Sequence, residues 1–246
     1  MPVTAVRFDR QAAVGITPEH WPGTIAAVRQ LMSDGLTLDR VTVLVGENGS
    51  GKSTLVEAIA QAYGLAPEGG STGARHSTRE SESPLHRALV LRRGIGASRW
   101  GFFLRAETMH GFFTYRERNP SGALLSDDAI VAEQFHEMSH GESFLEILAD
   151  RFDDAGLYVL DEPESALSFA GCLALVGLLH RIGQSPARQA IVATHSPIVA
   201  AVPGATILEV GEWGLRRVAW EDLELVQNWR DFLGDPSIFL RQVLDD

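Results

Sequence analysis

Residues 136–148, HEMSHGESFLEIL, bring together side chains that could do chemistry. Within this segment stand Ser139, His140, Gly141 and Glu142. A serine, a histidine and an acid are the residue types of a serine hydrolase, in which a histidine base activates a serine nucleophile. The segment lacks the G-x-S-x-G turn that joins a strand to a helix in such enzymes, which disfavours ester hydrolysis. A serine and a glycine before an apolar stripe also suit a helix N-terminus, which attracts anions.

The segment 46-GENGSGKST-54 carries a more specific signal. It fits the pattern G-x-x-x-x-G-K-[ST] and lies between a β-branched run at 41–45 and an apolar periodic segment at 53–64. Glycines allow such a loop to wrap a triphosphate, so that successive backbone N–H groups point at phosphate oxygens. We therefore predict nucleotide binding by eight residues: Gly46, Asn48, Gly49, Ser50, Gly51, Lys52, Ser53 and Thr54.

Two side chains of this loop have separate predicted roles. Lys52 is expected to reach the β- and γ-phosphates as a catalytic cation, and the Ser53 hydroxyl is expected to help hold Mg²⁺. Lys52 is the only lysine in a chain with 21 basic residues. An arginine would not easily replace its compact charge, which is consistent with a phosphate-binding role.

Polar side chains follow two further apolar runs. The run 157–160 is followed by Asp161 and Glu162, and the run 190–194 by His195. Because the carboxyl ends of parallel strands meet at one edge of a sheet, we expect these side chains beside the phosphate loop. Asp161 is then expected to reach Mg²⁺ through a water molecule. Glu162 is expected to act as the base for the attacking water, and His195 to bond the γ-phosphate.

The periodicity of the whole chain indicates an α/β fold with a mainly parallel central sheet. We predict strands at 3–8, 41–45, 101–109, 157–160, 190–194, 205–210 and 215–220. We predict helices at 24–31, 53–64 and 170–182, and further helices up to the C-terminus. Residues 67–99, rich in Gly, Ser, Arg and Pro, are expected to be irregular, and residues 110–156 to form a mostly helical lobe.

Composition limits the classes of protein to which the chain can belong. Its 246 residues, 45% hydrophobic and 22% charged, suit one sizeable core, so we predict a single domain over 1–246. A net charge of −11 disfavours nucleic acid as the primary ligand. The single cysteine, Cys172, excludes an internal disulfide and suits a cytoplasmic protein. No apolar run is long enough to predict a membrane span.

Taken together and in this order, the motifs resemble those of the ATP-binding-cassette ATPase superfamily. The phrases VTVLVGENGSGKSTLVEAIA, FFLRAE, SHGESFLEIL, YVLDEPESALS and IVATHSPI look like a bacterial group of small AAA-type ATPases with a cassette-like head. The resemblance runs from about residue 20 to the end. It implies a P-loop NTPase fold, Mg²⁺-dependent hydrolysis of ATP, and a homodimer that closes around two ATP molecules.

The family signature, commonly L-S-G-G-Q, looks like 138-MSHGE-142 in this chain. The resemblance implies that it contacts the γ-phosphate of ATP held by another subunit, through Ser139, His140, Gly141 and Glu142. Residues 165–168 are expected to line the same interface. Three residues depart from the family pattern: His140 stands for a glycine, Glu142 for a glutamine and Ser168 for an aspartate.

Two further roles have only candidates. Glu107 follows the FFLRA run and is the candidate for the residue that senses Mg²⁺ and water. Trp21 precedes the phosphate loop at a family-like separation and could stack on adenine, although an ordinary packing role explains it equally well.

The biological role has three alternatives: a stand-alone cytoplasmic ATPase with a protein partner, the nucleotide-binding subunit of a membrane transporter, and a DNA-repair-associated ATPase. The stretch between Thr54 and Ser139 is too short for the long coiled coil of chromosome-organising proteins. Arginines in 67–99 could form a local basic strip for DNA, but acids among them favour a solvated loop. We favour the stand-alone ATPase.

Overall fold

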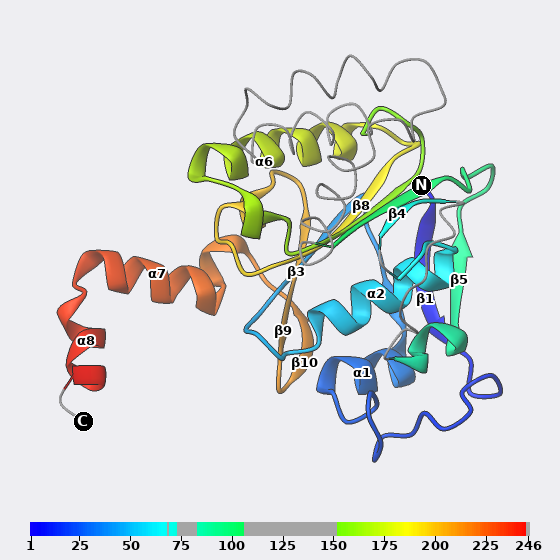
Figure 1. The fold of residues 1–246 in the computed structure, drawn as a ribbon, viewed down its shortest axis with the longest axis horizontal. Coiled ribbons are helices and arrows are strands. Elements are labelled where there is room, and N and C mark those ends of the chain that lie inside the picture. The colour runs from blue at the N-terminus through cyan, green and yellow to red at the C-terminus, as the bar shows by residue number, and fades with distance from the viewer. Residues whose placement is uncertain (68, 73–82, 106–151, 245–246) are drawn as a thin grey trace, which may run out of the picture.

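The computed structural model describes residues 1–67, 69–72, 83–105 and 152–244. A seven-stranded sheet forms the centre of the protein, with the strand order β10-β9-β3-β8-β7-β6-β4 (Figure 1). The five inner strands run parallel, and the edge strands β10 and β4 are antiparallel to their neighbours. The strands are β3 (Val41–Val45), β4 (Gly70–Ser71), β6 (Gly101–Arg105), β7 (Leu157–Asp161), β8 (Gln189–Thr194), β9 (Thr206–Gly211) and β10 (Gly214–Arg217).

Helices cover both faces of this sheet, which explains why its central strands are continuous apolar runs. Helices α1 (Ala26–Asp34) and α2 (Lys52–Tyr63) lie on one face, and α6 (Phe169–Gln184) lies on the other (Figure 1). Successive residues of a strand point to opposite faces. Accordingly, Leu44 packs in the core on the α2 side, whereas Val43 packs on the α6 side. The predicted α/β fold with a mainly parallel central sheet is confirmed.

A second sheet, which was not predicted from the sequence, flanks the first. It is antiparallel, with the order β2-β1-β5, and consists of β1 (Val3–Phe8), β2 (Leu36–Thr37) and β5 (Leu89–Arg93). The prediction that 67–99 is irregular is therefore wrong in part, because β4, β5 and the 3₁₀ helix η1 (Pro84–Ala88) lie there. Leu85 and Leu89 are buried in the core, so apolar burial orders this segment.

The C-terminal elements extend away from the sheet. The 3₁₀ helix η5 (Trp220–Asp222) leads into α7 (Glu224–Gly234), whose first N–H donates to Glu209 of β9. Helix α8 (Ser237–Leu244) follows and lies farther from the central strands (Figure 1). The predicted strand at 215–220 is shorter than expected, because β10 ends at Arg217. Val226 is the one residue of α7 that is buried.

The predicted helical lobe falls almost wholly outside the described residues. The structure describes nothing between 106 and 151, so the lobe and the single-domain organisation stay predictions. In the parts of the chain that are described, no helix is long and apolar enough to cross a membrane. Two further 3₁₀ helices complete the described elements: η3 (Pro163–Ala166) and η4 (Val199–Ala201).

Candidate active site

The glycine-rich loop 46–51 joins the end of β3 to the start of α2. Gly49 and Gly51 have φ angles of 81° and 98°, in the left-handed region that favours glycine. A Cβ on Gly51 would lie 2.4 Å from Ile25 Cγ2, and one on Gly46 would lie 2.3 Å from the Val210 carbonyl oxygen. The close approach of α1 and β9 therefore requires glycine at both positions, in addition to the shape that a phosphate would need.

Lys52 places its charge inside this loop. Its Nζ atom donates hydrogen bonds to the carbonyl oxygens of Gly46 and Glu47, at 2.8 Å each. Only 3% of the residue is exposed. Burial lowers the pKa of the Lys52 ammonium, and the carboxylates of Glu162 and Asp161 raise it and offset part of that effect.

Ser53 and Asp161 meet at the expected edge of the sheet. Ser53 Oγ donates a 3.0 Å hydrogen bond to Asp161 Oδ1, and Asp161 is buried at the end of β7. On the other side, Arg105 Nε lies 4.0 Å from Asp161 Oδ2, and Arg105 Nη1 lies 3.4 Å from Glu57 Oε2. Mg²⁺ prefers oxygen ligands and is commonly held by one or two protein side chains together with phosphates and waters. A hydroxyl and a carboxylate side by side fit that preference.

Glu162 and His195 come from neighbouring strand ends. Glu162 has a φ of 51°, unusual for a residue that is not glycine, and its N–H donates to the Ala193 carbonyl at 2.9 Å. His195 Nδ1 lies 3.6 Å from Glu162 Oε1 and also 3.6 Å from Glu164 Oε1. Glu164 was not predicted as a site residue. Its only signal in the sequence was a further acid directly after the proline of the DEP phrase.

A cavity of about 920 Å³ lies beside the glycine-rich loop. Its walls come from α1, the end of β3, the loop, the residue after β8, the β9–β10 hairpin and α7. They include Ile25, Asn48, Ser50, His195, Glu209 and Trp213. Asp161 and Glu162 do not line it, but His195, which lies 3.6 Å from Glu162 Oε1, also borders the cavity. The site therefore has two adjoining parts: a loop-lined cavity and an acidic edge.

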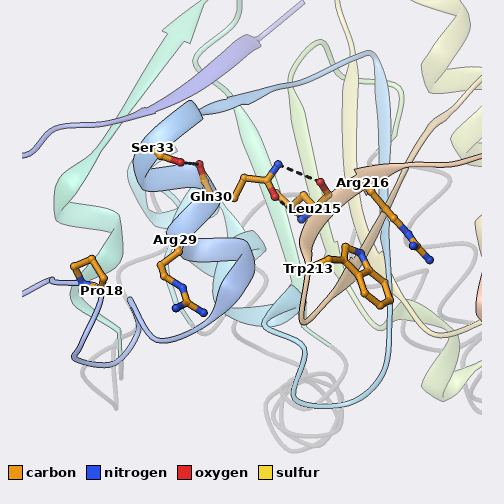
Figure 2. Close-up of a pocket in the computed structure, with 7 residues that line it drawn as sticks. All are labelled: Pro18, Arg29, Gln30, Ser33, Trp213, Leu215 and Arg216. Carbon is orange, nitrogen blue, oxygen red and sulfur yellow. Dashed lines mark hydrogen bonds between the residues drawn. The ribbon is translucent and has the colours of Figure 1, made fainter.

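Trp213, rather than Trp21, is the tryptophan that reaches this cavity. It stands in the turn between β9 and β10 and is 49% exposed. Figure 2 shows it beside Arg216, whose guanidinium carbon lies 4.0 Å from the centre of the Trp213 ring. Arg216 Nε in turn donates to Glu209 Oε2 at 2.7 Å, which fixes the guanidinium. In the sequence, the signal for Trp213 was its place in the glycine-bounded turn 211-GEWG-214.

Only some of the residues expected at the dimer interface belong to the part of the chain that the structure describes. The signature residues 139–142 and Glu107 lie outside the described residues. Ser165 is exposed, and its Oγ donates to the Glu162 carbonyl at 2.8 Å. Ser168 caps α6, because its Oγ accepts a 3.2 Å hydrogen bond from the Gly171 N–H. An aspartate caps a helix in the same way, so its replacement by Ser168 preserves the local structure.

Comparison with known proteins gives a family match and several relatives. Residues 41–129 match the family described as "AAA domain, putative AbiEii toxin, Type IV TA system". The chain is 32% identical to the vitamin B12 import ATP-binding protein BtuD of Yersinia enterocolitica, over 63% of this chain and 66% of that protein. It is 30% identical to the zinc import ATP-binding protein ZnuC 1 of Aliivibrio fischeri, over 58% of this chain and 54% of that protein.

Among solved structures, the chain is similar to cbiO1 from Clostridium perfringens, part of the ABC transporter complex cbiONQ. The TM-score is 0.44 at 16% identity, and the match covers 96% of this chain and 97% of that one. The chain spans less than two-thirds of the length of the two curated relatives above. The family match, these relatives and the strand, glycine-rich loop and helix at 41–63 agree. The chain therefore contains a P-loop ATPase domain of the ATP-binding-cassette type.

Proposed function

We propose that this protein binds ATP at the glycine-rich loop and hydrolyses it to ADP and phosphate, with Mg²⁺ as cofactor. The observation that carries the proposal is the convergence of three strand ends. Lys52 follows the loop after β3, Asp161 ends β7 with Glu162 directly after it, and His195 follows β8. Strands β7 and β3 both pair with β8. This arrangement supports a phosphate subsite and an acid pair within one edge of the sheet.

The residues of the loop would bind the triphosphate. Backbone N–H groups of 48–52 and the N-terminal end of α2 favour anionic oxygens, and Lys52 adds a full positive charge. Ser53 and Asp161 would hold Mg²⁺, which would supply positive charge to offset that of the phosphates. Binding of phosphate would require the Lys52 ammonium to exchange its bonds to the loop carbonyls for bonds to phosphate oxygens.

Glu162 would act on the attacking water. Its carboxylate accepts a hydrogen bond from the water and takes a proton as the oxygen bonds to the γ-phosphorus. The bond between that phosphorus and the bridging oxygen then breaks, and ADP leaves. His195 would orient the water or the γ-phosphate from the cavity side, which its place between the acids and the cavity supports.

We further propose that two copies close around two ATP molecules in the cytoplasm. The support is the sequence 138-MSHGE-142, which resembles a signature that contacts ATP in trans, and the exposed Ser165 and Ser168 near Glu162. We also propose that the dimer acts on a protein partner, which uses the cycle of ATP binding and hydrolysis.

A second candidate function is the ATP-binding subunit of an importer. It is favoured by one observation: the two curated relatives above are named as import ATP-binding proteins. In that case the chain would act with a separate membrane subunit. DNA-repair association is the third alternative, against which the net charge of −11 weighs.

The test of the main proposal is Glu162→Gln with ATP and Mg²⁺. The amide keeps the shape of the side chain but takes no proton, so hydrolysis should stop and an ATP-bound dimer should accumulate on a sizing column. Glu221→Gln is the matched control, because Glu221 is exposed and does not line the cavity beside the loop. A Glu162→Gln protein that stays monomeric and hydrolyses ATP normally would refute both roles.

The alternatives are separated by the rate of ATP turnover with and without single- and double-stranded DNA. Strong stimulation by DNA would favour the repair-associated class. An unchanged rate would favour a protein partner or a membrane subunit, which co-purification with a membrane fraction distinguishes.

A further inference from the structure

Glu164 makes contacts that the proposed mechanism does not use. The turn at Glu162 leads the chain into η3, which brings Glu164 under the end of β8. Its side chain is only 7% exposed. Glu164 Oε1 accepts hydrogen bonds from Thr194 Oγ1 at 2.6 Å and from the His195 N–H at 2.8 Å. These two bonds fasten the segment after β7 to the end of β8.

The bonds to Oε1 fix the backbone from which the His195 ring extends. The ring then lies with Nδ1 3.6 Å from Glu164 Oε1 and 3.6 Å from Glu162 Oε1. His195 also borders the cavity beside the glycine-rich loop. One edge of the imidazole therefore faces two acids, and the ring stands between these acids and the proposed phosphate subsite.

The second carboxylate oxygen of Glu164, Oε2, takes no part in these two hydrogen bonds. Glu164 Oε2 is buried and has no hydrogen-bond partner among the described residues. A neutral side chain with one acceptor oxygen could receive the same two bonds from Thr194 and His195. Burial of a charged carboxylate is unfavourable unless its charge is matched, so a role that needs the charge itself is indicated.

We propose that Glu164 is the positioning residue of His195, whose negative charge holds the imidazole proton on Nδ1 and leaves Nε2 as the nitrogen directed to the cavity. In this state Nε2 accepts a hydrogen bond and can orient the attacking water. The 3.6 Å separation is longer than a hydrogen bond, and contacts of this kind often shorten only when substrate binds. The consequence for hydrolysis rests on the proposed ATPase function, but the position of the proton does not.

The effect of Glu164 should exceed that of Glu162 on the same nitrogen. Both carboxylates lie at the same distance from Nδ1, but the Glu162 side chain is 32% exposed and that of Glu164 is 7% exposed. Water and salt screen an exposed charge more than a buried one. Removal of the buried charge should therefore change the proton position more.

The first measurement is the ¹⁵N spectrum of the imidazole nitrogens without nucleotide. The His195 signals are assigned by their loss in His195→Gln. Wild type should show a protonated Nδ1 and an unprotonated Nε2. Glu164→Gln should move a large part of the population to the other tautomer, and Glu162→Gln a smaller part. Thr194→Val, which removes one hydrogen bond to Oε1 but keeps the charge, should retain the wild-type tautomer.

The second measurement is steady-state ATP hydrolysis. Glu164→Gln should lower kcat by about ten-fold or more and change KM by less than about three-fold, as for a residue that orients a catalytic histidine. Glu221→Gln should behave as wild type. A Glu164→Gln protein with an unchanged His195 spectrum and an unchanged kcat would overturn the proposal, as would a tautomer change in Glu162→Gln alone.

The two measurements separate the proposals from each other. If wild type hydrolyses no ATP, the proposed function fails, but the spectrum without nucleotide still tests Glu164. If Glu164→Gln unfolds, Thr194→Val and Glu162→Gln remain, and a lost wild-type tautomer in Thr194→Val would show that hydrogen bonding, and not charge, positions the ring.

Discussion

Ser53 and Asp161 are joined by a 3.0 Å hydrogen bond from hydroxyl to carboxylate, although 108 positions separate them in the chain. The bond links the first turn of α2 to the end of β7, two strands away from β3 in the sheet. Arg105 lies 4.0 Å from the other oxygen of Asp161. The carboxylate is therefore held between a hydroxyl and a guanidinium, in the place where the proposed Mg²⁺ would need oxygen ligands.

Loss of either oxygen ligand should weaken the response to Mg²⁺. Asp161→Asn removes the charge and Ser53→Ala removes the hydroxyl, so we expect the Mg²⁺ concentration for half-maximal hydrolysis to rise about ten-fold or more in each. Binding of Mn²⁺ with an ATP analogue, followed by electron paramagnetic resonance, gives a readout independent of turnover. Ser33→Ala, on the exposed end of α1, is the control. Equal Mn²⁺ affinity in all three variants would contradict the assignment.

The buried Lys52 should make the stability of the nucleotide-free protein depend on pH. Burial lowers the pKa of Lys52 from 10.5, the value expected in the unfolded chain. Between the lowered pKa and 10.5 the unfolded chain binds more protons, so the free energy of unfolding should rise with pH in that window. Below the lowered pKa the dependence should vanish, because both states are protonated.

The predicted rise in the free energy of unfolding can be measured by urea unfolding between pH 7 and pH 10. Lys52→Met keeps a long apolar stem without a titrating group, so its stability should lack the rise that wild type shows. Arg40→Met, which removes an exposed cation, should follow wild type. Parallel curves for wild type and Lys52→Met would contradict the prediction.

Trp213 should contribute to nucleotide affinity, and Trp21 should not. Trp213 lines the cavity beside the loop, and its flat aromatic ring is a surface on which the adenine base of ATP can stack. Stacking of a base on an aromatic ring contributes about 1–3 kcal/mol, so Trp213→Ala should weaken ATP binding by that amount. Trp21→Ala is the matched control. Isothermal titration calorimetry with ATP measures both, and a larger loss in Trp21→Ala would restore the original expectation.

Local patterns predicted the elements that carry the proposed chemistry. The run 41-VTVLV-45 is β3 and the glycine-rich loop leads into α2, because burial on both faces and φ > 0 each leave a clear signature in the sequence. The polar residues after 157–160 and 190–194 were expected at one edge, and they lie there because β7 and β8 are parallel neighbours.

Pairings between distant segments could not be predicted in this way. Strand β5 exists because it pairs with β1, more than 80 residues earlier, and 89-LVLRR-93 has no alternating pattern of its own. Glu164 and Trp213 were missed for the same reason. Their importance depends on the end of β8 and on the cavity beside α1, and neither is visible from adjacent residues.

Three glycines with positive φ should respond differently to alanine. Gly49, Gly51 and Gly64 have φ angles of 81°, 98° and 106°. A Cβ meets nothing within 4 Å at Gly49 or Gly64, so alanine there should cost only the backbone strain, about 1–2 kcal/mol. At Gly51 the same Cβ would lie 2.4 Å from Ile25 Cγ2, and overpacking should add about 1–3 kcal/mol.

Chemical denaturation of the three variants, together with Ile25→Ala and the double variant Gly51→Ala/Ile25→Ala, separates strain from overpacking. In the double variant the clash is gone, so the cost of Gly51→Ala should fall to about the 1–2 kcal/mol of the open positions. Gly64→Ala should keep wild-type ATP affinity, since it lies at the far end of α2, whereas Gly49→Ala and Gly51→Ala should lower it. If Gly51→Ala costs as much stability in the Ile25→Ala background as in wild type, the close approach of α1 does not explain the requirement for glycine at 51.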